Sequence, residues 1–350
     1  MTRPRLVVLS RRGHASLPDD LWRRLEAASE VTVVRRDDAP DHATAVSLLR
    51  EADLVGSTNA CLPRLDADLL DALPRLRGLV LLATGHDHLD VPELGRRGIG
   101  LSVLPRYATL AVAEHALAMV LALATRLHLA NDRSRGDTGD VSLRGIELGG
   151  RTAGVVGVGR IGGRFTQLAR GIGMRVIGHD IDPAAVRRAA AGGAEMTDLD
   201  ELLGRADVVV LAASHVLGRP AILGPRELDR LRPGALLVNV GRAALVDGPA
   251  AAAALRTRRL RGYAVDDVVA DPVRDADLLR EGRLLQTGHS AWWRDEVLER
   301  GARMWGEHLL AAVEGCPLDA VTWPRDNAAM DLLGRALTEA LPVAAGGVPE

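Results

Sequence analysis

The sequence predicts an α/β protein built from two doubly wound parallel sheets. Short apolar segments alternate with amphipathic ones along most of the chain, and this alternation is typical of parallel strands whose connecting helices cover both faces of a sheet. A glycine-rich turn joins one of these strands to its helix at residues 157–162. Because two successive sets of strands and helices need two sheets, we expect two Rossmann-like domains.

The composition is that of a globular protein with no bias toward polyanionic partners. The chain has 350 residues, 47% of them hydrophobic and 26% charged, and its formal net charge is -2. This balance argues against a general affinity for nucleic acid or for an anionic membrane. All 44 basic residues are arginine, so no lysine is present to serve as a base or to form a Schiff base.

Cysteine content and hydropathy predict a cytoplasmic location. Two cysteines are too few for a disulfide framework, so a reducing compartment is the expected setting. The N-terminal apolar run is short and flanked by arginines, unlike the hydrophobic region of a signal peptide. The longest apolar stretch, 110–129, contains Glu114, His115, Arg126 and His128, so we do not expect it to span a membrane.

The first third of the chain predicts one complete set of strands and helices. An alanine- and leucine-rich helix is expected next, at 110–126, and its nearly all-round apolar surface indicates burial between domains or subunits. Residues 131–143 are polar and contain glycine, so we expect a connector there. The predicted strands are 6–9, 31–34, 54–55, 79–82 and 101–104, and the predicted helices are 21–28, 43–51 and 91–97.

A second set begins at Ala153, where the strand TAGVV leads into the glycine turn. After residue 289 the pattern changes to one long helix, predicted at 295–314, and then to a tail rich in proline, glycine and alanine. The predicted helices between these points are 160–172, 183–191, 199–203 and 249–256, and the strands are 175–179, 208–212, 236–240, 263–265 and 284–286.

The glycine turn predicts a dinucleotide-binding site. Gly157 permits a tight turn, Gly159 lets the backbone approach a pyrophosphate, and Gly162 lets the helix pack closely on the strand. The phosphate then lies at the helix N-terminus. Asp180 ends the next strand, 18 residues after Gly162, where a carboxylate accepts hydrogen bonds from the adenosine ribose. The same carboxylate repels a ribose 2′-phosphate, so we expect NAD(H). The turn reads Gly157-Val158-Gly159-Arg160-Ile161-Gly162, and Arg160 and Ile161 are included in the predicted cofactor site.

The chain resembles the D-isomer-specific 2-hydroxyacid dehydrogenases, a family that includes phosphoglycerate, formate and phosphite dehydrogenases. The likeness runs in register from about Leu54 to Pro317. The motifs that carry it are ATGHDHLD (83–90), VAEHALAMVLAL (112–123), GVVGVGRIGG (154–163), GMRVIGHD (173–180), LRPGALLVNVGRAALVD (231–247), GYAVDDVVADP (262–272) and TGHSAW (287–292).

The resemblance implies a catalytic set of three side chains. Arg242 matches the arginine that binds the substrate carboxylate and carbonyl oxygen, and His289 matches the acid/base histidine. Asp271 stands where the family usually has a glutamate that hydrogen-bonds this histidine. The chemistry is consistent, because hydride transfer to a carbonyl leaves an alkoxide that needs a proton, and histidine titrates near neutral pH. Arginine offers a planar, charged fork to a carboxylate.

The resemblance also implies contacts with the nicotinamide and the substrate. Asp266 matches a family aspartate that lies close to the nicotinamide. The substrate carboxylate is expected on the backbone N–H groups of Ala83, Thr84 and Gly85. Trp292 is expected to line the substrate cleft. His86 and His88 flank Asp87 without a third clear ligand, so no metal site is predicted.

Several departures from the family pattern surround the substrate rather than the cofactor. The usual Glu-Pro is Asp271-Pro272, and the usual Pro-His-Ile is Gly288-His289-Ser290. Gly56 stands where phosphoglycerate-type members have a substrate-binding arginine, which argues against 3-phosphoglycerate. The shorter Asp271 side chain would lengthen a bond to His289. We therefore expect a specialised small anionic substrate.

The resemblance implies a substrate-binding domain over residues 1–102, an NAD-binding Rossmann domain over 103–288, and a C-terminal segment, 289–350, that returns to the first domain. The active-site cleft is expected between the two domains, and the helix at 110–126 is expected to form a homodimer. The predicted function is NAD(H)-dependent hydride transfer between nicotinamide and a 2-keto or 2-hydroxy acid. Two alternatives stay open: an NAD-binding regulatory or non-catalytic homologue, and a dehydrogenase acting on a phosphonate- or phosphite-like anion.

Overall fold

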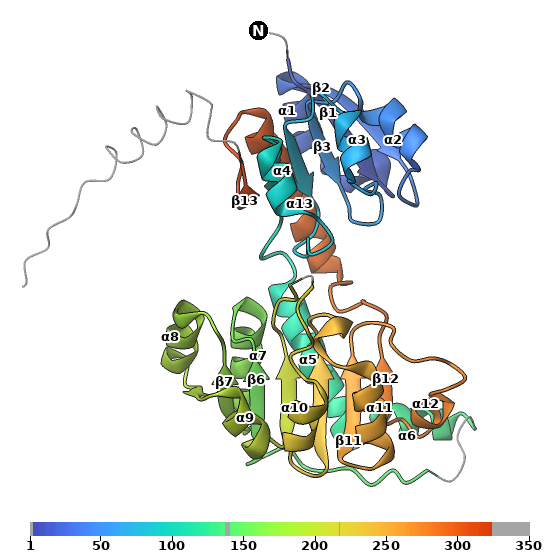
Figure 1. Ribbon diagram of the computed structural model, residues 1–350, viewed down its shortest axis with the longest axis vertical. Coiled ribbons are helices and arrows are strands. Elements are labelled where there is room, and N and C mark those ends of the chain that lie inside the picture. Colours follow the sequence, from blue (N-terminus) through green and yellow to red (C-terminus); the bar gives the residue numbers. More distant parts are fainter. Residues whose placement is uncertain (1–2, 137–140, 217, 324–350) are drawn as a thin grey trace, which may run out of the picture. The chain divides into compact units, whose positions relative to one another are not determined.

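The computed structural model describes residues 3–136, 141–216 and 218–323. The chain divides into two compact units (Figure 1). One unit is formed by Met1–Tyr107 with Leu298–Glu350, and the other by Ala108–Val297. Each contains its own sheet, so the predicted class, two α/β domains with parallel sheets, is confirmed.

The first unit contains a six-stranded sheet in the order β13-β5-β4-β3-β1-β2. Its strands are parallel except for β13, which pairs antiparallel with β5 at the edge. The strands are β1 Arg5–Ser10, β2 Glu30–Arg35, β3 Leu54–Ser57, β4 Gly78–Leu81, β5 Gly100–Ser102 and β13 Ala320–Thr322, and the helices are η1 Gly13–Ser16, α1 Asp19–Ala28, α2 His42–Leu49, α3 Ala67–Asp71, α4 Val91–Arg96 and α13 Asp295–Val313.

Alternate residues of β1 supply two separate cores, one on each face of this sheet. Val7 and Leu9 belong to the core that contains residues of α2, α3 and α4. Leu6 and Val8 belong to the core that contains residues of α1 and α13. Because successive side chains of a strand point to opposite faces, an all-apolar strand of this kind is buried on both sides.

The second unit contains a seven-stranded parallel sheet in the order β12-β11-β10-β9-β6-β7-β8. Counted from β6, this is the strand order of dinucleotide-binding sheets, with the reversal beside β6. The strands are β6 Thr152–Val156, β7 Arg175–His179, β8 Glu195–Met196, β9 Val208–Leu211, β10 Ala235–Asn239, β11 Leu260–Val265 and β12 Leu284–Gln286, and the helices are α5 Thr109–Thr125, α6 Leu127–Ser134, α7 Arg160–Gly171, α8 Pro183–Ala191, α9 Leu199–Arg205, α10 Pro225–Arg230, η2 Ala243–Leu245, α11 Gly248–Arg256 and α12 Ala276–Arg280.

The two faces of this sheet bury different helices. Val208 and Val210 belong to the core that includes residues of α5, α7 and α8, whereas Val209 and Leu211 belong to the core that includes residues of α9, α10 and α11. In Figure 1, α10 and α11 lie in front of the strands and α5 lies behind them. The prediction that the apolar helix at 110–126 is buried is confirmed in part, because seven of its side chains are buried.

The structure corrects the predicted connector at residues 131–143. Its first residues belong to α6, Leu127–Ser134, and residues 137–140 lie outside the described part of the chain. Arg126 adopts a left-handed backbone, φ 56°, that ends α5 and starts α6 in a new direction. No glycine or proline marks this break in the sequence, so periodicity did not predict it. The proline-, glycine- and alanine-rich tail from residue 324 onward also lies outside the described residues.

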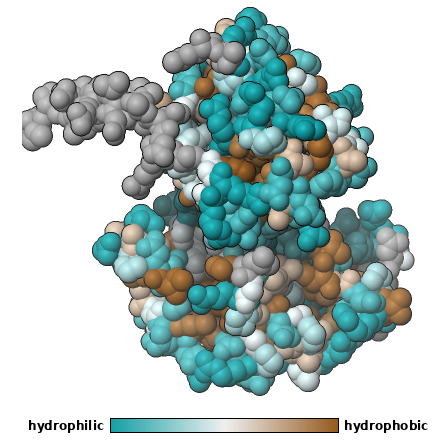
Figure 2. All heavy atoms as spheres, turned by 45° about the horizontal axis from the view of Figure 1, so that its top comes forward, coloured by the Kyte–Doolittle hydropathy of each residue, from teal (hydrophilic) through white to brown (hydrophobic). Residues whose placement is uncertain are grey.

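The face drawn in Figure 2 carries both polar and apolar side chains. Figure 2 shows a largely hydrophilic face interrupted by hydrophobic groups. Among the described residues, no single helix is long and apolar enough to cross a membrane. The bent pair α5 and α6 passes that criterion by length and composition when the two helices are taken together, but they meet at 64°.

Candidate active site

The glycine turn lies between β6 and α7, at the carboxyl end of the central strand. Gly157 has a left-handed backbone, φ +88°, and a Cβ there would lie 2.5 Å from the backbone nitrogen of Ala213. A Cβ at Gly162 would lie 2.0 Å from the carbonyl oxygen of Gly157. Both positions therefore require glycine, the first for its conformation and for close packing, the second for close packing alone.

The turn fits a dinucleotide. Gly159 caps α7 without a side-chain hydrogen bond, and a Cβ added there would meet no protein atom within 4 Å. The N-terminus of α7 is thus open at the point where a pyrophosphate would approach its N–H groups. Arg160 and Ile161 form the first turn of this helix.

Asp180 is fixed beside the same turn. Its Oδ2 accepts a hydrogen bond from the backbone N–H of Val158 at 2.8 Å, and its Oδ1 accepts one from the N–H of Asp182 at 2.9 Å. These bonds hold a carboxylate at the end of β7, next to the glycine turn. A negative charge held there favours a ribose with free hydroxyl groups over one that carries a 2′-phosphate.

Arg242 follows β10, at the carboxyl edge of the same sheet. Its backbone carbonyl accepts a hydrogen bond from the Asn239 side chain at 2.7 Å, and the Asn239 oxygen accepts one from the N–H of Gly241 at 3.0 Å. Asn239 is 1% exposed, so this buried amide fixes the turn that carries Arg242. The Arg242 side chain also donates to the Gly241 carbonyl at 3.0 Å.

His289 lies in an exposed turn that follows β12. Its backbone is left-handed, φ 60°, and so is that of Gly288, φ 60°. Proline cannot adopt this conformation because its ring fixes φ near −65°. The replacement of the family's proline by Gly288 therefore permits this backbone conformation of the histidine turn. A left-handed histidine is uncommon and persists only where its surroundings hold it.

Asp266 supplies the bonds that hold this turn. The residue follows β11 and is 8% exposed. Its Oδ1 accepts from the N–H of Ser290 at 2.8 Å, and its Oδ2 accepts from the N–H of Ala291 at 3.2 Å. Oδ1 also accepts from the hydroxyl of Thr287 at 2.8 Å. One buried carboxylate thus bonds residues on both sides of His289.

The bonding of Asp266 continues through Thr287 to His115 on α5. Arg294 donates to Nδ1 of His115 at 3.2 Å, and because arginine has no acceptor, Nδ1 must carry the lone pair. The proton of the neutral ring is then on Nε2, which donates to the Thr287 hydroxyl at 3.0 Å. Burial lowers the pKa of His115, although the charge of Asp266 opposes this shift and the charge of Arg294 adds to it only slightly, and a lowered pKa agrees with the neutral tautomer.

Asp271 occupies a different environment from the one predicted. Its Oδ1 accepts from the N–H groups of Val273 and Arg274, both at 2.8 Å, which closes a turn at the surface. These backbone hydrogen bonds lower the pKa of Asp271. Among the described residues, no hydrogen bond or ion pair joins Asp271 to His289. The structure therefore does not bring together the predicted carboxylate–histidine pair.

The predicted carboxylate-binding loop lies in the first unit, directly after β4. Ala83 is buried, and the Thr84 hydroxyl donates to the Leu104 carbonyl at 2.6 Å. The carbonyl of Gly85 accepts from the Asn59 side chain at 3.1 Å. Trp292 lies in the other unit, half-buried, with its ring centroid 5.0 Å from that of Trp293. Across the described residues, no group of three or more His, Cys, Asp and Glu is placed to hold a metal ion.

The relay through Thr287, His115 and Arg294 was not predicted from the sequence. The sequence placed His115 only within the apolar stretch 110–129, and it lies 172 residues from Thr287 and 179 from Arg294. No spacing or motif joins groups so far apart. Only the buried polar character of His115 within an apolar helix could have signalled a partner.

The glycine turn, its acid and the strand order together define an NAD-binding domain. Residues 117–291 match the family described as D-isomer specific 2-hydroxyacid dehydrogenase, NAD binding domain. A glyoxylate reductase of Aeropyrum pernix is 32% identical over 82% of this chain and 87% of its own length. A D-3-phosphoglycerate dehydrogenase of Mycobacterium bovis is 30% identical over 83% of this chain but only 54% of its own length.

A solved structure agrees with this assignment. The TT0316 protein of Thermus thermophilus has a TM-score of 0.75 and 30% identity, and the match covers 91% of this chain and 100% of that one. The chain belongs to the D-isomer specific 2-hydroxyacid dehydrogenase family. The predictions of an NAD-dependent oxidoreductase of this family, and of NAD(H) as its cofactor, are confirmed.

Proposed function

We propose that this chain reduces a small 2-keto acid with NADH, or oxidises the corresponding 2-hydroxy acid with NAD. The observation that carries the proposal is the fixed turn around His289, which a buried carboxylate holds within the NAD-binding unit. A proton-transferring histidine beside a bound nicotinamide is the arrangement that carbonyl reduction requires. The activity named for the Aeropyrum relative, reduction of glyoxylate, makes short 2-keto acids the first substrates to test.

Each proposed role follows from the chemistry of the side chain. When bound, NADH supplies the hydride to the carbonyl carbon. His289, acting in its protonated imidazolium form, gives a proton to the carbonyl oxygen and becomes neutral, so the products are the 2-hydroxy acid and NAD. Arg242 holds the substrate carboxylate and polarises the carbonyl oxygen. Asp266 positions the histidine turn, and Asp271 is the family-derived candidate partner of His289.

The remaining assignments concern the substrate, the assembly and the location. Ala83, Thr84 and Gly85 are proposed to donate backbone N–H groups to the substrate carboxylate, and Trp292 to contact its side chain. Substrate binding is assigned to the first unit and NAD binding to the second. A C2 homodimer is proposed through α5 and α6, because Leu110, Leu121 and Leu127 are large hydrophobic side chains that are 40%, 38% and 65% exposed. A cytoplasmic location is proposed from the two free cysteines.

The experiment is NADH oxidation with a panel of 2-keto acids, including glyoxylate, hydroxypyruvate and pyruvate, and NAD reduction with phosphite and 2-hydroxy acids. We expect turnover with a 2-keto acid, and we expect His289→Ala to lower kcat about 10³-fold, within the usual contribution of general acid catalysis. The Kd for NADH, measured by fluorescence, should change by less than about twofold, because the His289 side chain is proposed to contact the substrate and not the cofactor. Tight NADH binding without turnover on any compound would support a regulatory protein instead.

Cofactor preference is expected to depend on Asp180. Asp180→Ala removes the carboxylate beside the ribose site and should raise the ratio of NADPH to NADH efficiency by about tenfold, the effect of one charged contact. The ratio of kcat/KM values for the two cofactors measures this. Asp182→Ala, which removes a neighbouring carboxylate that caps α8, is the control. An unchanged ratio in Asp180→Ala would remove Asp180 from the cofactor site.

A further inference from the structure

A pocket lined by arginines lies in the NAD-binding unit, away from the glycine turn. Its volume is about 520 Å³, in the range of pockets that hold metabolites. Five arginines contribute to its wall: Arg126, Arg144, Arg258, Arg261 and Arg283. These residues come from the end of α5, from the segment before β6, and from the starts of β11 and β12. Tertiary folding, rather than a basic run in the sequence, gathers their charges.

The carboxylates of the wall do not balance this charge. Among the described residues that line the pocket, Glu281 is the one acid, so the formal charge of this described lining is five minus one, or +4. Glu281 is paired with Arg283, whose Nε lies 2.7 Å from Oε2. Arg126 donates to the backbone carbonyl of Glu281 at 2.6 Å, and Arg261 donates to that of Arg144 at 2.6 Å. Two arginines are thus held by neutral carbonyls rather than by acids.

Buried donors of these arginines are left without partners. Nε of Arg126 and Nε of Arg261 are both inaccessible to solvent and have no hydrogen-bond partner among the described residues. Burial is the main cause that lowers the pKa of Arg126, and the positive charges of Arg261 and Arg283 lower it further. Arg126 and Arg258 also have left-handed backbones, φ 56° and 61°, which are rare for residues other than glycine, asparagine and aspartate. Unpaired buried donors and unusual backbones concentrate at binding sites.

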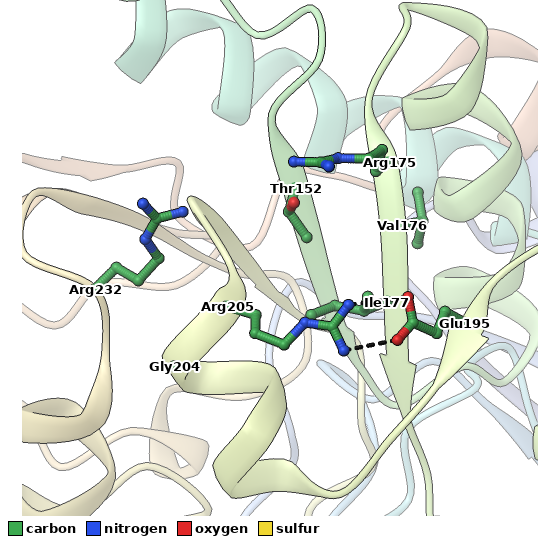
Figure 3. Close-up of a pocket in the computed structure, with 8 residues that line it drawn as sticks. All are labelled: Thr152, Arg175, Val176, Ile177, Glu195, Gly204, Arg205 and Arg232. Atoms are coloured by element: carbon green, nitrogen blue, oxygen red, sulfur yellow. Dashed lines mark hydrogen bonds and ion pairs between the residues drawn. The ribbon is translucent and has the colours of Figure 1, made fainter.

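A second pocket of similar size is also lined by arginines and allows a comparison of how their charges are paired. Figure 3 shows this pocket, about 480 Å³, with Arg205 against Glu195. Arg205 lies 2.6 Å from carboxylates of both Glu195 and Glu201, and Arg232 lies 3.0 Å from Asp207. Two of the three arginines in this pocket are therefore paired with acids of the same unit, and the third, Arg175, is exposed. The arginine pocket differs because, among the described residues, four of its five arginines form no ion pair with an acid, and only Arg283 is paired, with Glu281.

The arginine pocket is separate from the cofactor site. Gly234, Leu260 and Arg283, which line it, precede or begin β10, β11 and β12. The glycine turn follows the end of β6. Because all the strands of this sheet are parallel, their starts and ends lie at opposite edges. A ligand in the arginine pocket would not compete with the dinucleotide for the same groups.

We propose that this pocket binds a small polyanion that carries two or more phosphate or carboxylate groups. Guanidinium groups match both kinds of oxyanion in a two-pronged geometry, and the pocket presents several of them around one hollow. A multiply charged ligand would relieve the repulsion among the arginines and would accept hydrogen bonds from the exposed side chains of Arg144 and Arg258. This inference does not depend on the reaction proposed above.

The experiment measures binding of pyrophosphate and of citrate to the full chain by calorimetry and by thermal melting. Sodium chloride at matched ionic strength is the reference for screening. We expect at least one of the two anions to raise the Tm by several degrees beyond the chloride reference, as mass action predicts for a ligand near one hundred times its Kd. Preference for pyrophosphate would identify a phosphate ligand, and preference for citrate a polycarboxylate. Equal Tm values in all three salts would overturn the proposal.

Substitutions assign the binding to this pocket. Arg258→Asn keeps a residue that tolerates a left-handed backbone, and Arg144→Gln changes an exposed side chain, so both variants should fold. Each should raise the Kd of the preferred anion about tenfold, the usual effect of losing one charge-assisted contact. Arg175→Gln in the second pocket removes the same charge and should leave the Kd within about twofold. Equal weakening by all three variants would mean diffuse charge attraction and would overturn the assignment.

Discussion

Asp266 and Asp271 lie five residues apart in one connection, yet the fold uses them differently. Asp266 is buried and accepts hydrogen bonds from Thr287, Ser290 and Ala291, which surround His289. Asp271 is exposed, and within the described part of the chain its side chain accepts hydrogen bonds only from the turn that follows it. The family resemblance assigned the histidine partner to Asp271, but in the structure the acid connected to the histidine turn is Asp266.

This difference shows that the effect of an acid on a distant group depends on which groups its oxygens face and on whether water competes for the same hydrogen bonds. A buried carboxylate exchanges solvent for backbone N–H groups and so fixes the segment that carries them. An exposed carboxylate in a turn satisfies its own neighbours and has little influence beyond them. The relay from Asp266 through Thr287 to His115 extends this effect to α5.

The largest effect on stability and activity is expected when the carboxylate of Asp266 is removed. Asp266→Ala leaves the buried N–H of Ala291 without its acceptor, so the free energy of unfolding should fall by about 1–3 kcal/mol. The displaced His289 should lower kcat/KM about 100-fold, as expected for a misplaced catalytic group. Denaturant unfolding and steady-state rates measure the two effects. Asp267→Asn, next in the chain, is the control. If kcat/KM stays at the parent value, the turn does not need Asp266.

A smaller effect is expected when the Asp271 side chain is lengthened. Asp271→Glu restores the family's side chain and its longer reach. If the acid contacts His289 when substrate is bound, we expect kcat/KM to rise about threefold to tenfold, which is the scale of one improved hydrogen bond. The pH dependence of kcat should shift at the same time. Asp271→Asn is the control for the surface turn, since asparagine can still accept from the N–H groups of Val273 and Arg274. Unchanged kinetics in both variants would leave Asp266 as the one acid of the two that acts on the histidine turn.

The smallest effect concerns the pH dependence of folding. Burial lowers the pKa of His115 below its ordinary 6.5, so below that pH the unfolded chain binds a proton that the folded chain does not. The stabilisation is therefore present above pH 6.5 and decreases as pH falls toward the lowered folded value. Chemical denaturation from pH 7 to pH 5 should show a steeper loss of stability for the parent chain than for His115→Gln.

The comparison of the parent chain with His115→Gln isolates the contribution of His115 to the pH dependence of stability. The pKa of His308 is also lowered by burial, but His308 is present in both chains and contributes equally to the two slopes. Glutamine can still donate to Thr287 yet does not titrate. If the free energy of unfolding of the two chains changed with pH by the same slope, folding would not lower the pKa of His115. The hydrogen bonds from Asp266 through Thr287 to His115 would then not require the neutral ring.

Much of the fold was predictable because its signals are local. The boundaries of α8, β7 and β12 agree with their predicted ranges, since proline at a helix start and apolar runs between turns act over a few residues. The glycine turn was predictable for the same reason. The strand order and the antiparallel edge strand β13 were not predicted, because pairing joins segments far apart in the chain.

The sequence by itself determined the strand-turn-helix-strand unit that contains Gly157, Gly159, Gly162 and Asp180, because the geometry of this unit is local. It also supplied His289 and Arg242 as candidates through their motifs. Only the tertiary structure decided which acid holds the histidine turn and where arginines gather in excess over acids. Both outcomes depend on burial and on contacts between distant segments, and sequence spacing carries no information about either.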